Sequence, residues 1–233
     1  MKNINPSYLY LKPTLMVTFF LILCGCQKAD SSKEETASTS IAFEETATDA
    51  EGNTYPLVKI GTQVWMAENL RLTKTNCPDA IEMQFTNGIE RGPGVTFYDG
   101  KARYAYYNNN PSLGYGVIYS YGAVFQCDLC PTGFRIPSKA DFEQLVANFD
   151  NPIEAGKALL SSGESGFNAN PVGRIDDYGS VLGGQIGFWW TTDIEDHPEN
   201  RNHIYNFELS AKGVLKIKTQ DPRVGNYVRC IKE

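Results

Sequence analysis

Cysteine is the residue type whose spacing in this chain most directly suggests chemistry. Two of the six cysteines form Cys127-Asp-Leu-Cys130, a spacing found in redox and metal-binding sites. A zinc site would need a second such pair or a nearby histidine, and a thioredoxin-like site would place a helix directly behind the pair, where this chain has Pro131-Thr-Gly. We therefore expect structural disulfides among four cysteines, for which three pairings are possible. The four are Cys77, Cys127, Cys130 and Cys230.

Histidines and carboxylates show no further signature. His197 and His203 are the two histidines, and neither lies in a nucleophile or zinc motif. Acidic residues cluster at Asp176-Asp177 and near Asp193, but without the spacing of a calcium loop. We expect no catalytic residue, no metal site and no cofactor, and we interpret these side chains as surface charges.

Composition limits the classes of partner. The chain has 21 Lys and Arg against 27 Asp and Glu, which gives a formal net charge of −6 and a pI of about 5.1. This balance argues against a nucleic-acid partner or an anionic membrane surface as the binding target. A hydrophobic fraction of 42% with 21% charged residues is typical of a packed globular protein.

The first residues predict export. Lys2 and Lys12 precede an apolar stretch, Leu15 to Leu23, which is too short to span a bilayer as a mature helix and reads as a signal peptide. The sequence Leu23-Cys-Gly-Cys26 resembles the lipobox of bacterial lipoproteins, which implies cleavage before a cysteine that then carries lipid. We expect a signal peptide at 1–25, lipid on Cys26 and an outer-membrane anchor, facing the periplasm or the cell surface. The alternative is an ordinary signal peptide with incidental cysteines.

The segment that follows is polar and acidic. Residues 26–46 contain almost no large apolar side chains, so they cannot bury enough surface to offset the entropy of ordering. We interpret them as a flexible tether. Alternatively, the acidic residues behind Cys26 are a sorting signal for the outer cell surface, as in some Bacteroidetes lipoproteins. The folded domain is expected at 47–233.

The domain alternates strand and turn signals around two helices. Residues 54–60 and 63–67 flank Gly61-Thr62 and predict a β-hairpin. Ser138 and Asp141 approximate a capping box ahead of a helix with a periodic apolar face, and Asn151-Pro152 starts a second helix of about ten residues. We interpret the aromatic-rich segment 104–121 as the edge of the core and a loop rather than as regular sheet. Further strands are expected at 187–192, 203–209, 214–218 and 227–231, which together make an α+β domain.

Aromatic residues provide the candidate binding surface. A flat ring with a polar rim suits an amphipathic partner such as a sugar. The alternative is that most of these rings fill the core. Because neighbours in a strand point to opposite faces, at most one of Trp189 and Trp190 is buried on a given side, and the outward one is the best single candidate. The candidate binding residues are Trp189, Trp190, Tyr107 and Tyr115.

Several blocks of sequence follow one another along the domain. The blocks are Asp49-x-Glu-Gly-Asn-x-Tyr55, Val58-x-Ile-Gly-x-Gln-Val-Trp-Met-Ala-Glu-Asn-Leu70, Tyr104-x-Tyr-Tyr-Asn108, Tyr115-Gly-x-x-Tyr119, Cys130-Pro-x-Gly-Phe-Arg-Ile-Pro-Ser138, Ser165-Gly-Phe167, Phe188-Trp-Trp-Thr191 and Val228-Arg-Cys230. In this order they resemble the Fibrobacter succinogenes major paralogous domain, a family of exported bacterial proteins without an established general activity. The resemblance runs from about residue 47 to the C-terminus. It implies an irregular C-type-lectin-like domain with short antiparallel strands and two helices, related to the formylglycine-generating sulfatase-modifying enzymes.

The resemblance also implies a disulfide pairing and a function. Cys130 is expected to bridge to Cys230, which leaves Cys77 to Cys127. The related enzymes work through two cysteines near the C-terminal strand, where this chain has only Cys230. We therefore expect a non-catalytic cell-envelope lipoprotein that attaches to the membrane through its lipid and binds a glycan or an envelope protein. The alternatives are an enzyme of the sulfatase-modifying or carbohydrate-active type and a structural subunit of a surface filament.

Overall fold

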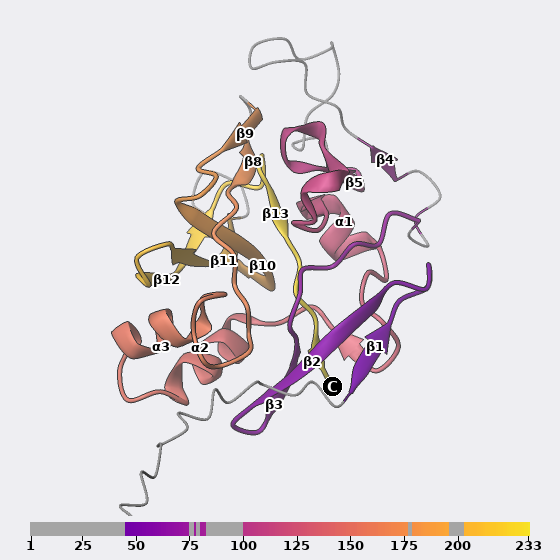
Figure 1. The fold of residues 1–233 in the computed structure, drawn as a ribbon. Coiled ribbons are helices and arrows are strands. Elements are labelled where there is room, and N and C mark those ends of the chain that lie inside the picture. Colours follow the sequence, from indigo (N-terminus) through magenta and orange to yellow (C-terminus); the bar gives the residue numbers. More distant parts are fainter. Residues whose placement is uncertain (1–44, 75–76, 78–79, 83–99, 177–178, 196–202) are drawn as a thin grey trace, which may run out of the picture. The chain divides into compact units, whose positions relative to one another are not determined.

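The computed structural model describes residues 45–74, 77, 80–82, 100–176, 179–195 and 203–233. These residues all belong to one compact unit, Ser40–Glu233. The unit is a mixed α and β fold in which strands predominate and antiparallel pairing prevails (Figure 1). Its described helices are α1 (Tyr121–Gln126), α2 (Lys139–Ala147) and α3 (Pro152–Leu159), with short 3-10 helices η2 (Tyr107–Asn109) and η3 (Pro111–Leu113).

The strands form two sheets. The five-stranded sheet has the order β1-β2-β3-β14-β7, made of Thr46–Thr48, Thr54–Ile60, Gln63–Met66, Ile231–Lys232 and Phe134–Arg135. The main path of the nine-stranded sheet has the order β12-β11-β10-β13-β6-β5-β4, made of Leu215–Gln220, His203–Ser210, Ile186–Glu195, Gly225–Tyr227, Ile118–Ser120, Arg103–Ala105 and Ile81–Glu82. It is completed by β8 (Arg174–Asp176), which pairs with β13, and β9 (Gly179–Val181), which pairs with β8.

Local sequence signals account for the hairpin and two of the helices. β2 and β3 pair around the predicted turn, where Gly61 has a φ of +59°, a value that favours glycine. The capping box of α2 is formed, because Ser138 Oγ accepts from the Asp141 N–H at 3.1 Å while Asp141 bonds back to the Ser138 N–H. In α3 the Asn151 side chain accepts from two backbone N–H groups, but the helix ends at Leu159 after 8 residues.

The structure corrects two expectations. The segment before Tyr121 contains the buried strand β6, and α1 follows it as an unpredicted helix capped by the Ser120 hydroxyl. The final predicted strand is two strands, since β13 lies in the nine-stranded sheet and β14 in the five-stranded one. The C-terminal segment therefore connects the two sheets. The first described strand, β1, begins at Thr46.

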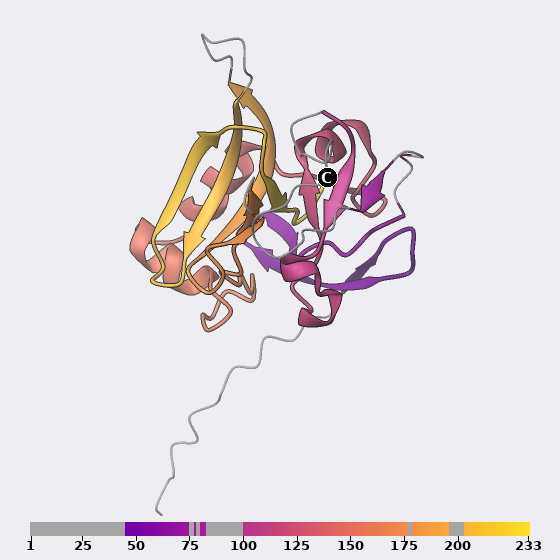
Figure 2. The ribbon, with the colours of Figure 1, turned by 90° about the horizontal axis from the view of Figure 1, so that it is seen from above.

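Both faces of the central strands are covered. One face of β10 and β11 packs against α2 and α3 through Trp189 and Phe207, which join Phe142 and Leu145 in one core cluster. Figure 2 shows these helices behind the long strands of the sheet. A second cluster on the other face contains Trp190 and, among others, Met66, Leu70, Tyr119 and Val228. Side chains that alternate along β10 therefore enter two different cores.

Candidate functional site

Neither of the two predicted tryptophans faces solvent. Trp189 and Trp190 point to opposite faces of β10, yet both are 0% exposed because each face is covered. Trp189 Nε1 donates to Asn69 Oδ1 at 2.7 Å, and Trp190 Nε1 donates to the Tyr119 carbonyl at 2.8 Å. Both indoles are thus core residues with satisfied N–H groups, and neither offers a surface to a ligand.

Asn69 and Trp189 belong to a buried network around Arg229. Asn69 Oδ1 also accepts from Arg229 Nη2 at 2.8 Å, and Arg229 Nη1 donates to the Phe167 carbonyl. The guanidinium lies 4.5 Å from the Phe167 ring centroid and 5.6 Å from that of Trp189. Burial lowers the pKa of Arg229 to about 9, against the opposing effect of the Glu68 charge. These residues come from four of the blocks that carry the family resemblance, so those blocks encode the core.

The four cysteines of the domain form two disulfides. Cys130 is bonded to Cys230 and Cys77 to Cys127, which are the pairings that the resemblance implied. Cys230 is 0% exposed, and its sulfur is held in a disulfide rather than available as a thiolate. Within the described ranges, no group of three or more His, Cys, Asp or Glu residues is arranged to hold a metal ion.

The two predicted tyrosines lie side by side. Tyr107 opens η2 and Tyr115 follows η3, and their ring centroids are 6.3 Å apart at an interplanar angle of 63°. Both rings are partly buried and pack on the helix-facing core cluster. Tyr107 is held by its hydroxyl, which accepts from the Gly183 N–H at 3.1 Å. Its ring lies so close to Gly173 that a Cβ there would approach it to 2.8 Å. Tyr107 therefore has a fixed orientation, and the Tyr115 ring packs beside it.

The chain between the two tyrosines is exposed but anchored. Residues 108–114 are all exposed. The Asn108 N–H donates to Ser180 Oγ at 2.7 Å, and the Asn110 side chain accepts from the Ser112 N–H at 3.0 Å. Asn108 and Asn109 both adopt a φ of +52°, a left-handed conformation that asparagine tolerates better than most residues. The surface formed by Tyr107, Tyr115 and residues 108–114 thus combines two aromatic rings with the amide and hydroxyl groups of an anchored loop.

A buried hydroxyl lies in the same core cluster as the tyrosine pair. Tyr227 is 0% exposed, and its hydroxyl has no hydrogen-bond partner in the described part of the chain. Burial raises the pKa of Tyr227, with smaller contributions from Tyr107 and Tyr115. Because buried polar groups are normally partnered, this hydroxyl is available to a water molecule or a ligand group.

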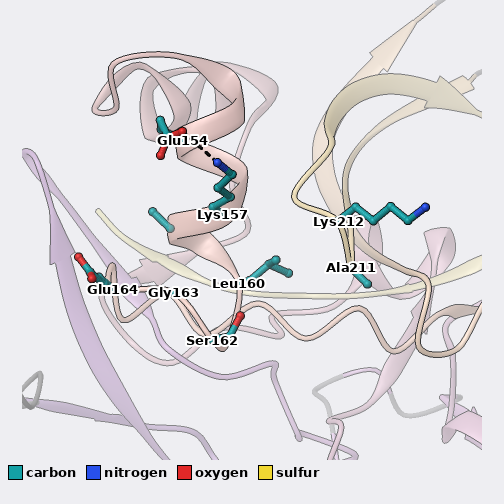
Figure 3. A pocket seen from close by; sticks show the side chains of 9 residues that line it. Glu154, Lys157, Leu160, Ser162, Gly163, Glu164, Ala211 and Lys212 are labelled. Atoms are coloured by element: carbon teal, nitrogen blue, oxygen red, sulfur yellow. Dashed lines mark hydrogen bonds and ion pairs between the residues drawn. The ribbon is translucent and has the colours of Figure 1, made fainter. Parts of the chain in front are cut away.

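A separate pocket lies between α3, the turn that follows it and the β11–β12 turn (Figure 3). It has a volume of about 460 Å³, within the range of small-ligand sites. Leu160 and Ala211 provide apolar surface, and Glu154 pairs with Lys157 at 3.1 Å on its rim. Its lining contains no aromatic ring. The full lining is Glu154, Lys157, Ala158, Leu160, Ser162, Gly163, Glu164, Ala211 and Lys212. These are ordinary surface residue types without a diagnostic spacing, and sequence reasoning did not find them.

The other predicted residues lie apart from these features. His203 begins β11 and is partly buried. His197 and Asp177 lie outside the described residues, as do Cys26 and the predicted signal peptide and most of the tether. Among the helices that the structure describes, none has the length and apolar content to cross a membrane.

Comparison with known proteins identifies the family. The family described as the Fibrobacter succinogenes major domain matches residues 58–232, which is well over half of the chain. No curated protein and no solved structure matches the chain. The matched range contains both disulfides, the Arg229 network and the tyrosine pair. The chain belongs to the Fibrobacter succinogenes major domain family.

Proposed function

We propose that this protein is a non-catalytic binding module of the bacterial cell envelope and that it binds a glycan at the tyrosine pair. The observation that carries the proposal is the partly exposed pair of Tyr115 and the anchored Tyr107 beside the exposed 108–114 loop. An envelope protein that presents an amphipathic surface is the alternative partner.

The chemistry of the surface supports a sugar ligand. The rings offer apolar faces to the C–H surface of a sugar, while backbone groups, amides and hydroxyls of the loop can bond its hydroxyls. The contacts of Tyr107 with Gly183 and of Asn108 with Ser180 hold the loop before any ligand binds. Little conformational entropy is then lost on binding, which favours affinity.

We also propose that the domain is C-type-lectin-like. Two features support this relationship: β14 pairs with both β3 and β7, so that the C-terminal strand joins the N-terminal hairpin, and the Cys130–Cys230 disulfide ties it there. The disulfide counts against the related thiol enzymes, because Cys230 has no free thiolate. Against strand addition in a filament, the sheet edge β12 carries the exposed lysines Lys216 and Lys218, which disfavour pairing with another strand.

Export and anchoring are the second part of the proposal. We propose that residues 1–25 are removed and that Cys26 carries lipid in the outer membrane. Intact-mass measurement of protein from the native envelope should show a chain that begins at Cys26 with added acyl mass. A Cys26→Ser variant should lack this mass and leave the membrane fraction. An unprocessed, unacylated wild-type chain would contradict the proposal.

The glycan site is tested by substitution with a matched control. Full-length wild-type protein is screened on an array of bacterial and host glycans together with Tyr115→Ala and Tyr121→Ala. Tyr121 is also a partly buried tyrosine in a ring pair, with Phe125 at 4.7 Å, but it lies in α1. We expect wild type and Tyr121→Ala to bind the same glycans and Tyr115→Ala to lose them, although both variants lose a partly buried ring and should be destabilised to a similar extent. Equal binding by all three proteins would place the site elsewhere.

A further inference from the structure

A second polar feature lies on the sheet face opposite α2 and α3. Paired residues of neighbouring strands lie on the same face of a sheet. Asn206 is paired with Trp190 and Glu208 with Phe188, and Phe188 and Trp190 are two residues apart on β10. Asn206 and Glu208 therefore lie on one face, the face that carries Trp190. This face also carries a group of polar side chains from β8, β11, β12 and β13 that we name the Arg174 cluster. The Arg174 cluster consists of Arg174, Asn206, Glu208, Gln220 and Asn226. Asn206 and Asn226 are 0% exposed and Glu208 is 5% exposed.

Among the described residues of the Arg174 cluster, Glu208 has an oppositely charged partner and Arg174 has none. Arg174 Nη1 donates to Gln220 Oε1 at 2.7 Å, and the guanidinium lies 4.6 Å from the Phe188 ring centroid. Glu208 Oε1 is already engaged, by Lys218 Nζ at 3.1 Å and Asn206 Nδ2 at 3.2 Å. In the described part of the molecule, no carboxylate lies within hydrogen-bond distance of Arg174. Burial lowers the pKa of Arg174, and the more distant charges of Glu208 and Asp176 oppose this effect.

The cluster holds several buried polar atoms without partners. Three donors, Arg174 Nε, Gln220 Nε2 and Asn226 Nδ2, make no hydrogen bond to any described residue. Two acceptors, the Oδ1 atoms of Asn206 and Asn226, also lack a hydrogen-bond partner among the described residues. Each such atom is unfavourable in a folded protein, and native structures contain few of them. Three of the five are donors beside a guanidinium, an arrangement that suits a partner that accepts hydrogen bonds and carries negative charge.

We propose that the Arg174 cluster is a ligand site, separate from the tyrosine pair, that binds a carboxylate group such as that of an acidic sugar. A carboxylate matches the fork of an arginine through Nε and Nη, and its remaining lone pairs can accept from the two amides. The exposed Lys216, which lies opposite Glu208 on β12, adds a positive charge to the same face and attracts an anion. This site is independent of the proposed function, because Tyr107 packs on the opposite, helix-facing core.

The proposal is tested by side-chain NMR of the ¹⁵N-labelled full-length protein. Sodium glucuronate is the probe and glucose is the uncharged control. We expect glucuronate to shift the Arg174 Nε–H resonance with saturation and glucose to leave it unchanged. Either an unchanged Arg174 resonance or an equal shift with glucose would overturn the proposal. The first result would mean that water alone fills the cluster.

Two variants of equal charge test whether glucuronate binds at Arg174 or responds only to the overall charge of the protein. Arg174→Gln and Lys59→Gln each remove one positive charge, and Lys59 is exposed on β2 in the other sheet. We expect Lys59→Gln to bind glucuronate as wild type does and Arg174→Gln to bind at least tenfold more weakly. If Arg174→Gln does not fold, Arg174→Lys retains the charge without the planar fork and is expected to show the same weakening. Wild-type affinity in a folded Arg174 variant would contradict the site.

Discussion

Removal of the Cys130–Cys230 disulfide is expected to destabilise the domain severely. The two cysteines are 100 residues apart in the sequence, so the bond closes a loop that includes most of the fold. In the chain-entropy relation, a closure of this length contributes about 4.7 kcal/mol to the free energy of unfolding. Single domains have total stabilities of about 5–15 kcal/mol, so the double variant Cys130→Ala/Cys230→Ala should lose between about a third and nearly all of its stability.

The second disulfide provides the matched comparison. Cys77 and Cys127 are 50 residues apart, for which the same relation gives about 4.1 kcal/mol. Each pair contains one buried cysteine, Cys230 at 0% exposed and Cys127 at 8%, so the void left by alanine is similar in both variants. From the loop lengths we therefore expect the Cys130/Cys230 variant to lose about 0.6 kcal/mol more than the Cys77/Cys127 variant.

Urea unfolding followed by tryptophan fluorescence measures both losses. All three tryptophans are 0% exposed, so their emission reports directly on the core. The unfolding free energy of each double variant is compared with that of oxidised wild type under the same conditions. A Cys130/Cys230 variant whose stability lies within about 1 kcal/mol of wild type would refute the reasoning, because the loop closure would then contribute far less than its length requires.

Two further predictions concern backbone packing and pH. Gly156→Ala should lower the unfolding free energy by about 1–3 kcal/mol in denaturant titrations, because its Cβ would lie 1.8 Å from the Gly213 carbonyl oxygen. This cost is expected to exceed the gain from the better helix propensity of alanine. An unchanged stability would show that the turn at Gly213 moves to make room. Burial alone would raise the pKa of Asp141, but hydrogen bonds from Arg135 and Ser138 outweigh it and hold the pKa below the usual 3.8. The ionised Asp141 therefore stabilises the fold above pH 3.8, and this stabilisation is lost as the pH falls through the folded pKa. The acid-induced loss of stability should be smaller in Asp141→Asn than in wild type. The control Asp150→Asn removes an exposed carboxylate and should behave as wild type does.

Local signals made part of the fold predictable. The β2–β3 hairpin follows from a two-residue turn, and the start of α2 follows from Ser138 and Asp141, because these features depend on residues close together in the chain. Helix α1 was missed, since its 6 residues are too few to show a periodic apolar face. Its Gly122 also lowers helix propensity, although close approach to the Lys101 carbonyl requires glycine there.

The candidate sites show where sequence reasoning stops. Alternation in β10 correctly places Trp189 and Trp190 on opposite faces, but whether a face is covered depends on strands and helices far away in the sequence. The proximity of Tyr107 and Tyr115 was easier to anticipate, since only a short loop separates them. The Arg174 cluster could not be anticipated, because its members come from four strands whose register the sequence does not reveal.

The central claim is that the tyrosine pair holds a glycan, and a crystal structure of the full-length protein with its tightest-binding array glycan tests it most directly. The account predicts a sugar ring packed against Tyr107 or Tyr115, with its hydroxyls bonded to the 108–114 loop and no bond in the glycan cleaved. A glycan bound in the pocket beside α3, or a cleaved product at any site, would contradict it.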